Sequence, residues 1–258
     1  GYNAVRFHHY EGTLVDRSGG TSTSMKADVF DQFDGLFSEL KKRGIYATTD
    51  LYVSRPVFAA EIWPGATGDV AMDEFKMLVP VNEAAYQNFM AWTRNFMTHR
   101  NPYTGMTYAA DPTLAWISLI NEGNEGNFIQ RLSARAKTEW LKAWNAWLTE
   151  IHGDTAALAA AWGEDNVGTL EQGTVPLPGS FTDETAKSRD FAVFIATVEQ
   201  RFFARVKTAI RGELGSAVLL TNLNAWTNTK QCQVLRTAYD YVDDHFYVDH
   251  PEFIEQPW

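Results

Sequence analysis

Apolar residues follow two alternating patterns along this chain, and each pattern predicts a different kind of element. Steps of three and four residues predict amphipathic helices over residues 29–43, 82–100, 132–152 and 183–211. Short apolar runs between them predict strands over residues 4–8, 45–52, 113–120, 218–223 and 241–247. Strands that are joined by long helical crossovers predict βα units and a parallel sheet.

The segments between these elements divide into loops and shorter helices. Residues 11–26 are polar and glycine-rich, which favours a loop. Residues 53–80 contain Pro56 and Pro64 and are expected to form a long irregular loop, of the kind that usually carries function. Asp154 is expected to cap a short helix over residues 155–162, and a further helix is expected over residues 228–238.

Polar and aromatic side chains stand at the end of every predicted strand. The carboxyl ends of parallel strands meet at one edge of the sheet, where a (β/α)8 barrel keeps its chemistry. The groups at these ends are Arg6, His8, His9, Asp50, Tyr52, Asn121, Glu122, Asn222, Asn224, Trp226, Asp243, Asp244, His245 and Tyr247. Any one of them also fits a solvated turn, but their presence at all five ends predicts a functional cleft.

The chemistry of this set indicates the expected partner. It combines neutral hydrogen-bonding groups, aromatic rings and a carboxylate. Such a cleft suits a polyhydroxylated substrate, because hydroxyls need many hydrogen bonds and the apolar face of a sugar ring packs on an aromatic plate. We therefore expect an oligo- or polysaccharide as the partner.

Composition narrows the fold and the partner classes. The chain has 258 residues and is 45% hydrophobic, which fits a single α/β domain of the (β/α)8 TIM-barrel type over residues 1–258. The net charge is −10 and no block of Lys and Arg occurs, so neither nucleic acid nor an anionic membrane is an expected partner. No long apolar run is found, so a soluble protein is expected, in the bacterial cytoplasm or exported.

No cofactor and no metal site is predicted. Phosphate-binding glycine loops and the G-x-S-x-G motif are absent from the sequence. Cys232 is the only cysteine, which excludes an internal disulfide. No HxH or HExxH spacing occurs, and the adjacent His8 and His9 would point to opposite faces of a strand. A metal-dependent barrel enzyme stays open as a rival interpretation.

Several segments are similar to those of one enzyme group. They are NAVRFHH at residues 3–9, FSELKKRGIYATTDLY at 37–52, LINE at 119–122, WLKAWNAWLTEIHGD at 140–154, LTNLNAW at 220–226 and DDHFY at 243–247. Together they resemble the clan A glycoside hydrolases, the retaining (β/α)8 enzymes that include family five cellulases and mannanases and family forty-two β-galactosidases. The resemblance implies that residues 3–247 correspond to the second to sixth strands of the barrel.

The resemblance also implies roles for individual residues. Glu122 matches the fourth-strand general acid/base, and Asn121 matches the residue that binds the sugar hydroxyl beside the scissile bond. Arg6 matches an arginine that supports the catalytic carboxylates, and His245 and Tyr247 match a pair near the nucleophile. The remaining substrate-binding candidates, His8, His9, Asp50, Tyr52, Asn224 and Trp226, follow from their places at strand ends.

One part of the family pattern is missing. A retaining hydrolase needs a second carboxylate about 5 Å from the first, and the family places it on the seventh strand. We expect a partial barrel that lacks the first strand and the last two, with Glu252 and Glu255 as weak substitutes for the nucleophile. The expected alternatives for such a chain are an inactive or self-associating fragment, a homo-oligomer that completes the barrel, and a non-catalytic carbohydrate-binding protein.

Overall fold

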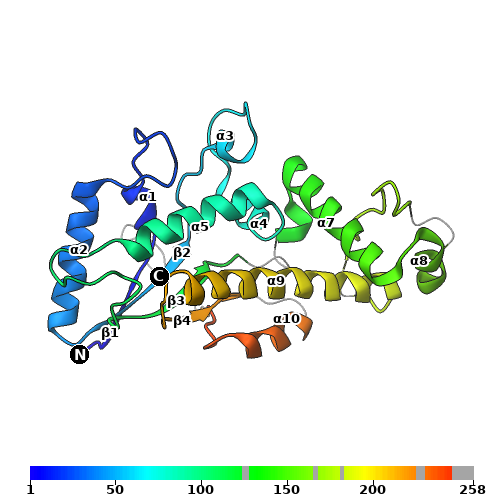
Figure 1. The fold of residues 1–258 in the computed structure, drawn as a ribbon. Helices are drawn as coiled ribbons and strands as arrows, with labels where there is room; N and C mark the ends of the chain where they lie inside the picture. Colours follow the sequence, from blue (N-terminus) through cyan, green and yellow to red (C-terminus); the bar gives the residue numbers. More distant parts are fainter. Residues whose placement is uncertain (124–127, 165–167, 181–182, 225–229, 246–258) are drawn as a thin grey trace, which may run out of the picture.

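The computed structural model describes residues 1–123, 128–164, 168–180, 183–224 and 230–245 (Figure 1). In these ranges one sheet is formed, in sequential order, by β1 (Ala4–Phe7), β2 (Tyr46–Tyr52), β3 (Leu114–Ile120) and β4 (Leu219–Thr221). All neighbouring strands run parallel. The predicted α/β class and the parallel sheet are confirmed.

The register brings the carboxyl ends of the strands to one edge. Asp50 of β2 pairs with Ser118 of β3, and Ser118 pairs in turn with Thr221 of β4. The ladder continues past β3, because the Asn121 amide donates to the Tyr52 carbonyl over 2.9 Å. Residues that follow these strands therefore meet at the same edge, as the sequence predicted.

The fifth predicted strand is wrong in its described part. Residues 241–245 adopt no regular strand, and residues 246–247 lie outside the described ranges. The segment nevertheless lies next to β4, since Asp240 N donates to Leu220 O over 2.9 Å and His245 N donates to Asn224 O over 2.7 Å. Between these two bonds, Asp243 and Asp244 form no regular backbone pairing with β4. The two bonds nevertheless hold His245 at the carboxyl edge of the sheet.

Long helices follow the first three strands. They are α2 (Ala27–Lys42), α5 (Glu83–Thr98) and α9 (Ala186–Gly212), and all three were predicted to within a few residues. Helix α5 begins at the predicted cap, where Asn82 Oδ1 accepts from the Ala85 amide over 2.9 Å. After β4 come α10 (Lys230–Leu235) and the 3-10 turn η2 (Arg236–Ala238), at the predicted position.

Two predicted loops contain helices. Residues 11–26 begin with α1 (Glu11–Leu14), and residues 53–80 contain α3 (Ala59–Ile62) and α4 (Met72–Leu78). Tertiary contacts favour these short helices over an irregular loop. The Glu11 carboxylate, for example, accepts from the Val53 and Ser54 amides over 2.6 and 2.7 Å. Helices of four to seven residues are too short for apolar periodicity to reveal them.

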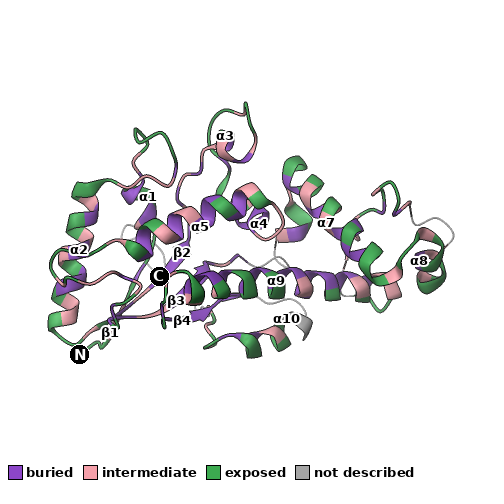
Figure 2. Ribbon diagram, in the orientation of Figure 1, coloured by how far each residue is buried: buried purple, intermediate pink, exposed green. Residues whose placement is uncertain are grey.

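A second group of helices packs on the first half of α9, away from the sheet (Figure 1). It comprises η1 (Ile129–Arg131), α7 (Ala134–His152) and α8 (Thr155–Trp162). The ring of Trp144 contacts those of Trp147 and Trp162 at centroid distances of 5.6 and 6.1 Å. It also contacts Phe194 at 5.1 Å. These tryptophans are therefore core residues, and their buried faces join one continuous apolar core (Figure 2).

None of the helices in the described ranges combines the length and apolarity that crossing a membrane requires.

Candidate active site

A cavity of about 650 Å³ opens at the carboxyl edge of the sheet. Residues from β1, α4, the turns that follow β1, β2 and β3, and the segment beside β4 line it: Arg6, His8, His9, Val53, Met72, Lys76, Asn121, Glu122, Asp243, Asp244 and His245. Eight of these eleven residues belong to the strand-end groups that predicted a cleft, and six of the eight were predicted as catalytic or substrate-binding residues. The strand ends thus bring together in space what the sequence separates by up to 239 positions.

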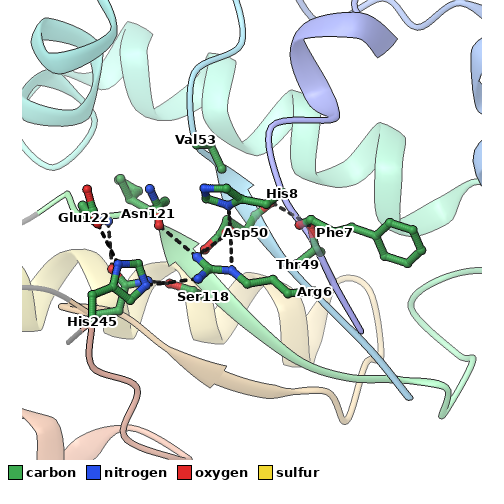
Figure 3. A network of polar contacts seen from close by, with 12 residues as sticks. Arg6, Phe7, His8, Thr49, Asp50, Val53, Ser118, Asn121, Glu122 and His245 are labelled. Carbon is green, nitrogen blue, oxygen red and sulfur yellow. Dashed lines mark hydrogen bonds and ion pairs between the residues drawn. The ribbon is translucent and has the colours of Figure 1, made fainter. Parts of the chain in front are cut away.

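Arg6 is the centre of a hydrogen-bond network that joins three strand ends (Figure 3). Its Nη2 donates to both carboxylate oxygens of Asp50 over 2.9 Å and to Asn121 Oδ1 over 2.9 Å. Its Nε reaches Asp50 Oδ2 at 3.2 Å. Asp50 is fully buried, so the guanidinium compensates a carboxylate that water cannot reach.

The same guanidinium defines the proton positions on His245. Arg6 Nη1 lies 3.1 Å from His245 Nε2, and His245 Nδ1 lies 2.7 Å from Glu122 Oε1 (Figure 3). Arginine only donates hydrogen bonds, so Nε2 must accept and the proton of the neutral ring resides on Nδ1. His245 therefore donates to Glu122 and orients its carboxylate.

Glu122 is held by its backbone as well as by its side chain. Its amide donates to Asn224 Oδ1 over 2.8 Å, and Asn224 Nδ2 donates to Ser118 Oγ over 3.2 Å. The Glu122 side chain keeps 27% of its surface exposed, toward the cavity. The carboxylate is thus both accessible and restrained, which general acid/base catalysis requires.

Backbone strain concentrates at this edge. The non-glycine residues with positive φ in the described ranges are His9, Glu122 and Leu223, at 55°, 51° and 54°. They follow β1, β3 and β4. A side chain in this left-handed region costs about 1 kcal/mol or more, and such residues cluster at functional sites.

Further buried polar groups connect the ends of β3 and β4 to helix α9. Asn222 Oδ1 accepts from the Ile120 amide over 3.1 Å, and Asn222 Nδ2 donates to Glu199 Oε1 over 2.9 Å. The Tyr239 hydroxyl donates to the same oxygen over 2.6 Å. These bonds connect β3 and β4 to helix α9 at the residue that precedes the Asn121–Glu122 turn.

The two adjacent histidines take different partners. His8 Nδ1 lies 3.1 Å from Asp50 Oδ2, and His9 Nδ1 lies 2.8 Å from Ser54 Oγ. The positive φ of His9 turns its ring back toward that of His8, so the rings meet edge to face at 4.3 Å. Both therefore line the cavity, although a regular strand would have separated them.

The other predicted site residues lie elsewhere or outside the described ranges. Tyr52 is fully buried: its ring packs on Phe75 at 4.7 Å and its hydroxyl donates to the Arg55 carbonyl over 3.4 Å. Its predicted place at the cleft is wrong, because α4 covers the ring. Asp50 and Asn224 lie one layer beneath the cavity and act through Arg6 and Glu122. The predictions for Trp226, Tyr247, Glu252 and Glu255 fall on residues that are not described.

Lys76 is the main lining residue that sequence reasoning missed. It belongs to α4, in the segment that was predicted to be irregular, and burial lowers its pKa from the usual value of 10.5. A lysine within the apolar run Phe75–Val79 was the available signal. In the described ranges, no cluster of three or more His, Cys, Asp or Glu side chains is suited to hold a metal ion.

Comparisons with known proteins identify the fold. No family model and no curated protein sequence matches this chain. Its structure is similar to a β-galactosidase from the Antarctic haloarchaeon Halorubrum lacusprofundi, with a TM-score of 0.65, 15% identity, and coverage of 95% of this chain and 36% of that one. A β-galactosidase from the psychrophilic Marinomonas ef1 gives a TM-score of 0.57, 15% identity, and coverage of 85% and 32%.

The chain thus spans about a third of the length of these two β-galactosidases. At this identity the likeness concerns the fold. The fold is the one that the sequence resemblance predicted, part of a (β/α)8 barrel.

Proposed function

We propose that this chain carries the acid/base half of a glycoside hydrolase site, and that Glu122 is the general acid that protonates the glycosidic oxygen. One observation carries the proposal: Glu122 lies in the turn that follows β3 and is restrained by His245 and Asn224, while its carboxylate faces a 650 Å³ cavity. A carboxylic acid so placed can deliver a proton to a leaving group and later activate water. The expected substrate is a β-linked oligo- or polysaccharide.

The surrounding groups have matching tasks. Asn121 is 5% exposed, and its Oδ1 is already occupied by Arg6, so its amide nitrogen is the atom available to a sugar hydroxyl. His8 and His9 line the same cavity and offer ring nitrogens for hydrogen bonds. The retaining mechanism requires a second carboxylate. Asp243 and Asp244 share the cavity with Glu122, and Arg236 pairs with Asp244 at 3.3 Å, which leaves Asp243 as the described carboxylate to test first.

The test is hydrolysis of lactose and of 4-nitrophenyl β-D-galactoside, with the corresponding glucoside and mannoside as alternatives. The Glu122→Gln variant should lose about 10²- to 10⁴-fold in kcat/KM on lactose, because its leaving group needs a proton. The loss should be smaller on the nitrophenyl glycoside, whose leaving group is stable as an anion. The exposed Glu150→Gln is the matched control. Equal losses on both substrates would contradict a general-acid role.

The alternative is saccharide binding without hydrolysis. It is favoured by one observation: of the described carboxylates in the Arg6–His245 network, Asp50 is fully buried and only Glu122 faces the cavity. Binding of lactose by a protein that releases no galactose, with Asp243→Asn leaving this binding unchanged, would support the alternative. Turnover that Glu122→Gln abolishes would exclude it.

A further inference from the structure

Lys76 is a buried cation in the wall of the candidate site. It is 4% exposed, and it lines the same cavity as Glu122. Its neighbours on α4, Phe75, Met77 and Leu78, are buried in the core. Burial of an ammonium group is costly unless acceptors replace the water that it loses.

The described part of the chain does not supply such an acceptor. No hydrogen bond or ion pair joins Lys76 Nζ to any residue in the described ranges. More exposed lysines are paired, as in Lys41–Asp111 at 2.7 Å and Lys207–Asp240 at 2.6 Å. A donor that is buried, without a partner and at the wall of a cavity therefore calls for a ligand.

The charges around Lys76 indicate what kind of ligand fits. Burial lowers its pKa, and the carboxylates of Asp73, Glu122, Asp50 and Glu11 oppose that decrease. They act on the ammonium through space but make no hydrogen bond to it. These carboxylates offset part of the cost of burying the positive charge, while the three N–H donors have no partner in the described ranges. A ligand needs to bring oxygen acceptors rather than a further negative charge.

We propose that Lys76 is a substrate-binding residue whose ammonium donates to hydroxyl oxygens of a neutral sugar unit held beside Glu122. This inference rests on the proposed saccharide-binding function of the cavity and names the group that selects an uncharged sugar. An acidic sugar would meet Glu122 and Asp243 on the same cavity wall, and like charges repel.

The first test compares Lys76→Met with the exposed Lys137→Met, using lactose binding by calorimetry and thermal unfolding. Lys76→Met should weaken lactose binding about tenfold to a hundredfold, as expected for a lost charged hydrogen bond. It should also leave Tm unchanged or raise it, because the buried ammonium has no protein partner. Lys137→Met should change neither quantity. Normal lactose affinity with a lowered Tm would show a purely structural lysine and overturn the inference.

The second test separates neutral from acidic sugars. Galactose and galacturonate are titrated into the wild-type protein and Lys76→Met. The expected result is a larger loss of affinity for galactose. A larger loss for galacturonate would overturn the choice of a neutral sugar.

A third measurement distinguishes this inference from the proposed function. NMR signals of isotope-labelled lysine amines and histidine rings are followed while lactose is added, and hydrolysis is assayed separately. A shift of the His245 signal without a shift of the Lys76 signal would overturn the inference about Lys76 but would support saccharide binding at the cavity. Shifts of both residues in a protein that never hydrolyses lactose support the inference and contradict the hydrolase. If neither signal shifts, both the inference about Lys76 and the proposed function are contradicted.

Discussion

His245 Nδ1 lies 2.7 Å from Glu122 Oε1, although 123 positions separate the two residues in the chain. The other ring nitrogen accepts from Arg6 at 3.1 Å, so the imidazole is fixed at both ends. Three carboxyl-edge segments therefore determine the orientation of one carboxylate. Removal of the imidazole should affect catalysis more than folding.

His245→Phe tests this directly. The variant loses the hydrogen bond that orients Glu122, so kcat on 4-nitrophenyl β-D-galactoside should fall about tenfold to a hundredfold while KM changes little. Steady-state kinetics measure both constants. The matched control is His152→Phe, since His152 pairs with Asp190 at 2.8 Å away from the cavity. An equal loss of kcat in the control would contradict a specific role for His245.

Arg6→Met should destabilise the fold. The substitution leaves the buried Asp50 carboxylate with only His8 as a partner, so the free energy of unfolding should fall by about 3 kcal/mol. Urea denaturation measures the change. The double variant Arg6→Met/Asp50→Asn should recover part of the loss, because it removes the uncompensated charge together with its partner. Additive losses would show that the two residues do not interact.

Asn224 and Asn222 form a matched pair for testing the support of Glu122. Each is buried, and each accepts from a backbone amide at the end of β3, Asn224 from Glu122 and Asn222 from Ile120. Replacement of either by Ala should cost about 1–3 kcal/mol of stability. Only Asn224→Ala should also lower kcat strongly, because only its bond holds Glu122, the proposed general acid. Thermal unfolding and kinetics together separate the two effects.

Buried tyrosines should control stability at high pH. Burial raises the pKa of Tyr52 and of Tyr108 well above the usual value of 10.0. The stabilisation is therefore complete below pH 10, where the unfolded chain keeps its phenolic protons, and it decreases as the pH rises above 10. A step in tyrosinate absorbance from the buried tyrosines should coincide with the loss of circular dichroism.

Tyr52→Phe should shift this alkaline unfolding to higher pH and leave KM unchanged, since the ring lies in the core. A changed KM would indicate that Tyr52 contacts the substrate after all. Loss of circular dichroism without a coincident step in tyrosinate absorbance would contradict the coupling of ionisation to unfolding.

We also expect the chain to self-associate. A cavity of about 590 Å³ at the opposite edge of the sheet is lined partly by apolar side chains, and Tyr46 and Leu219 there expose 52% and 45% of their surface. Exposed apolar groups beside a parallel sheet favour association with a second copy. Light scattering should show a mass that rises with concentration. Leu219→Glu should reduce it, whereas Val242→Glu, at another exposed apolar position, should not.

The sequence by itself determined the alternation of strands and helices and the place of Asn121 and Glu122. Periodicity identifies long amphipathic helices such as α5, and a buried run that ends in polar residues identifies a strand end. Both signals are local, so a single sequence contains them. The parallel arrangement followed because long crossovers allow no simpler connection.

Only the tertiary structure decided which side chains share the site. Lys76 reaches the cavity, and Tyr52 is kept from it, through α4, a helix too short to give a periodic signal. His245 reaches Glu122 through two hydrogen bonds beside β4 rather than through a regular strand. Such contacts depend on residues far apart in the chain, and they override local preference because burial and hydrogen bonding outweigh intrinsic propensity.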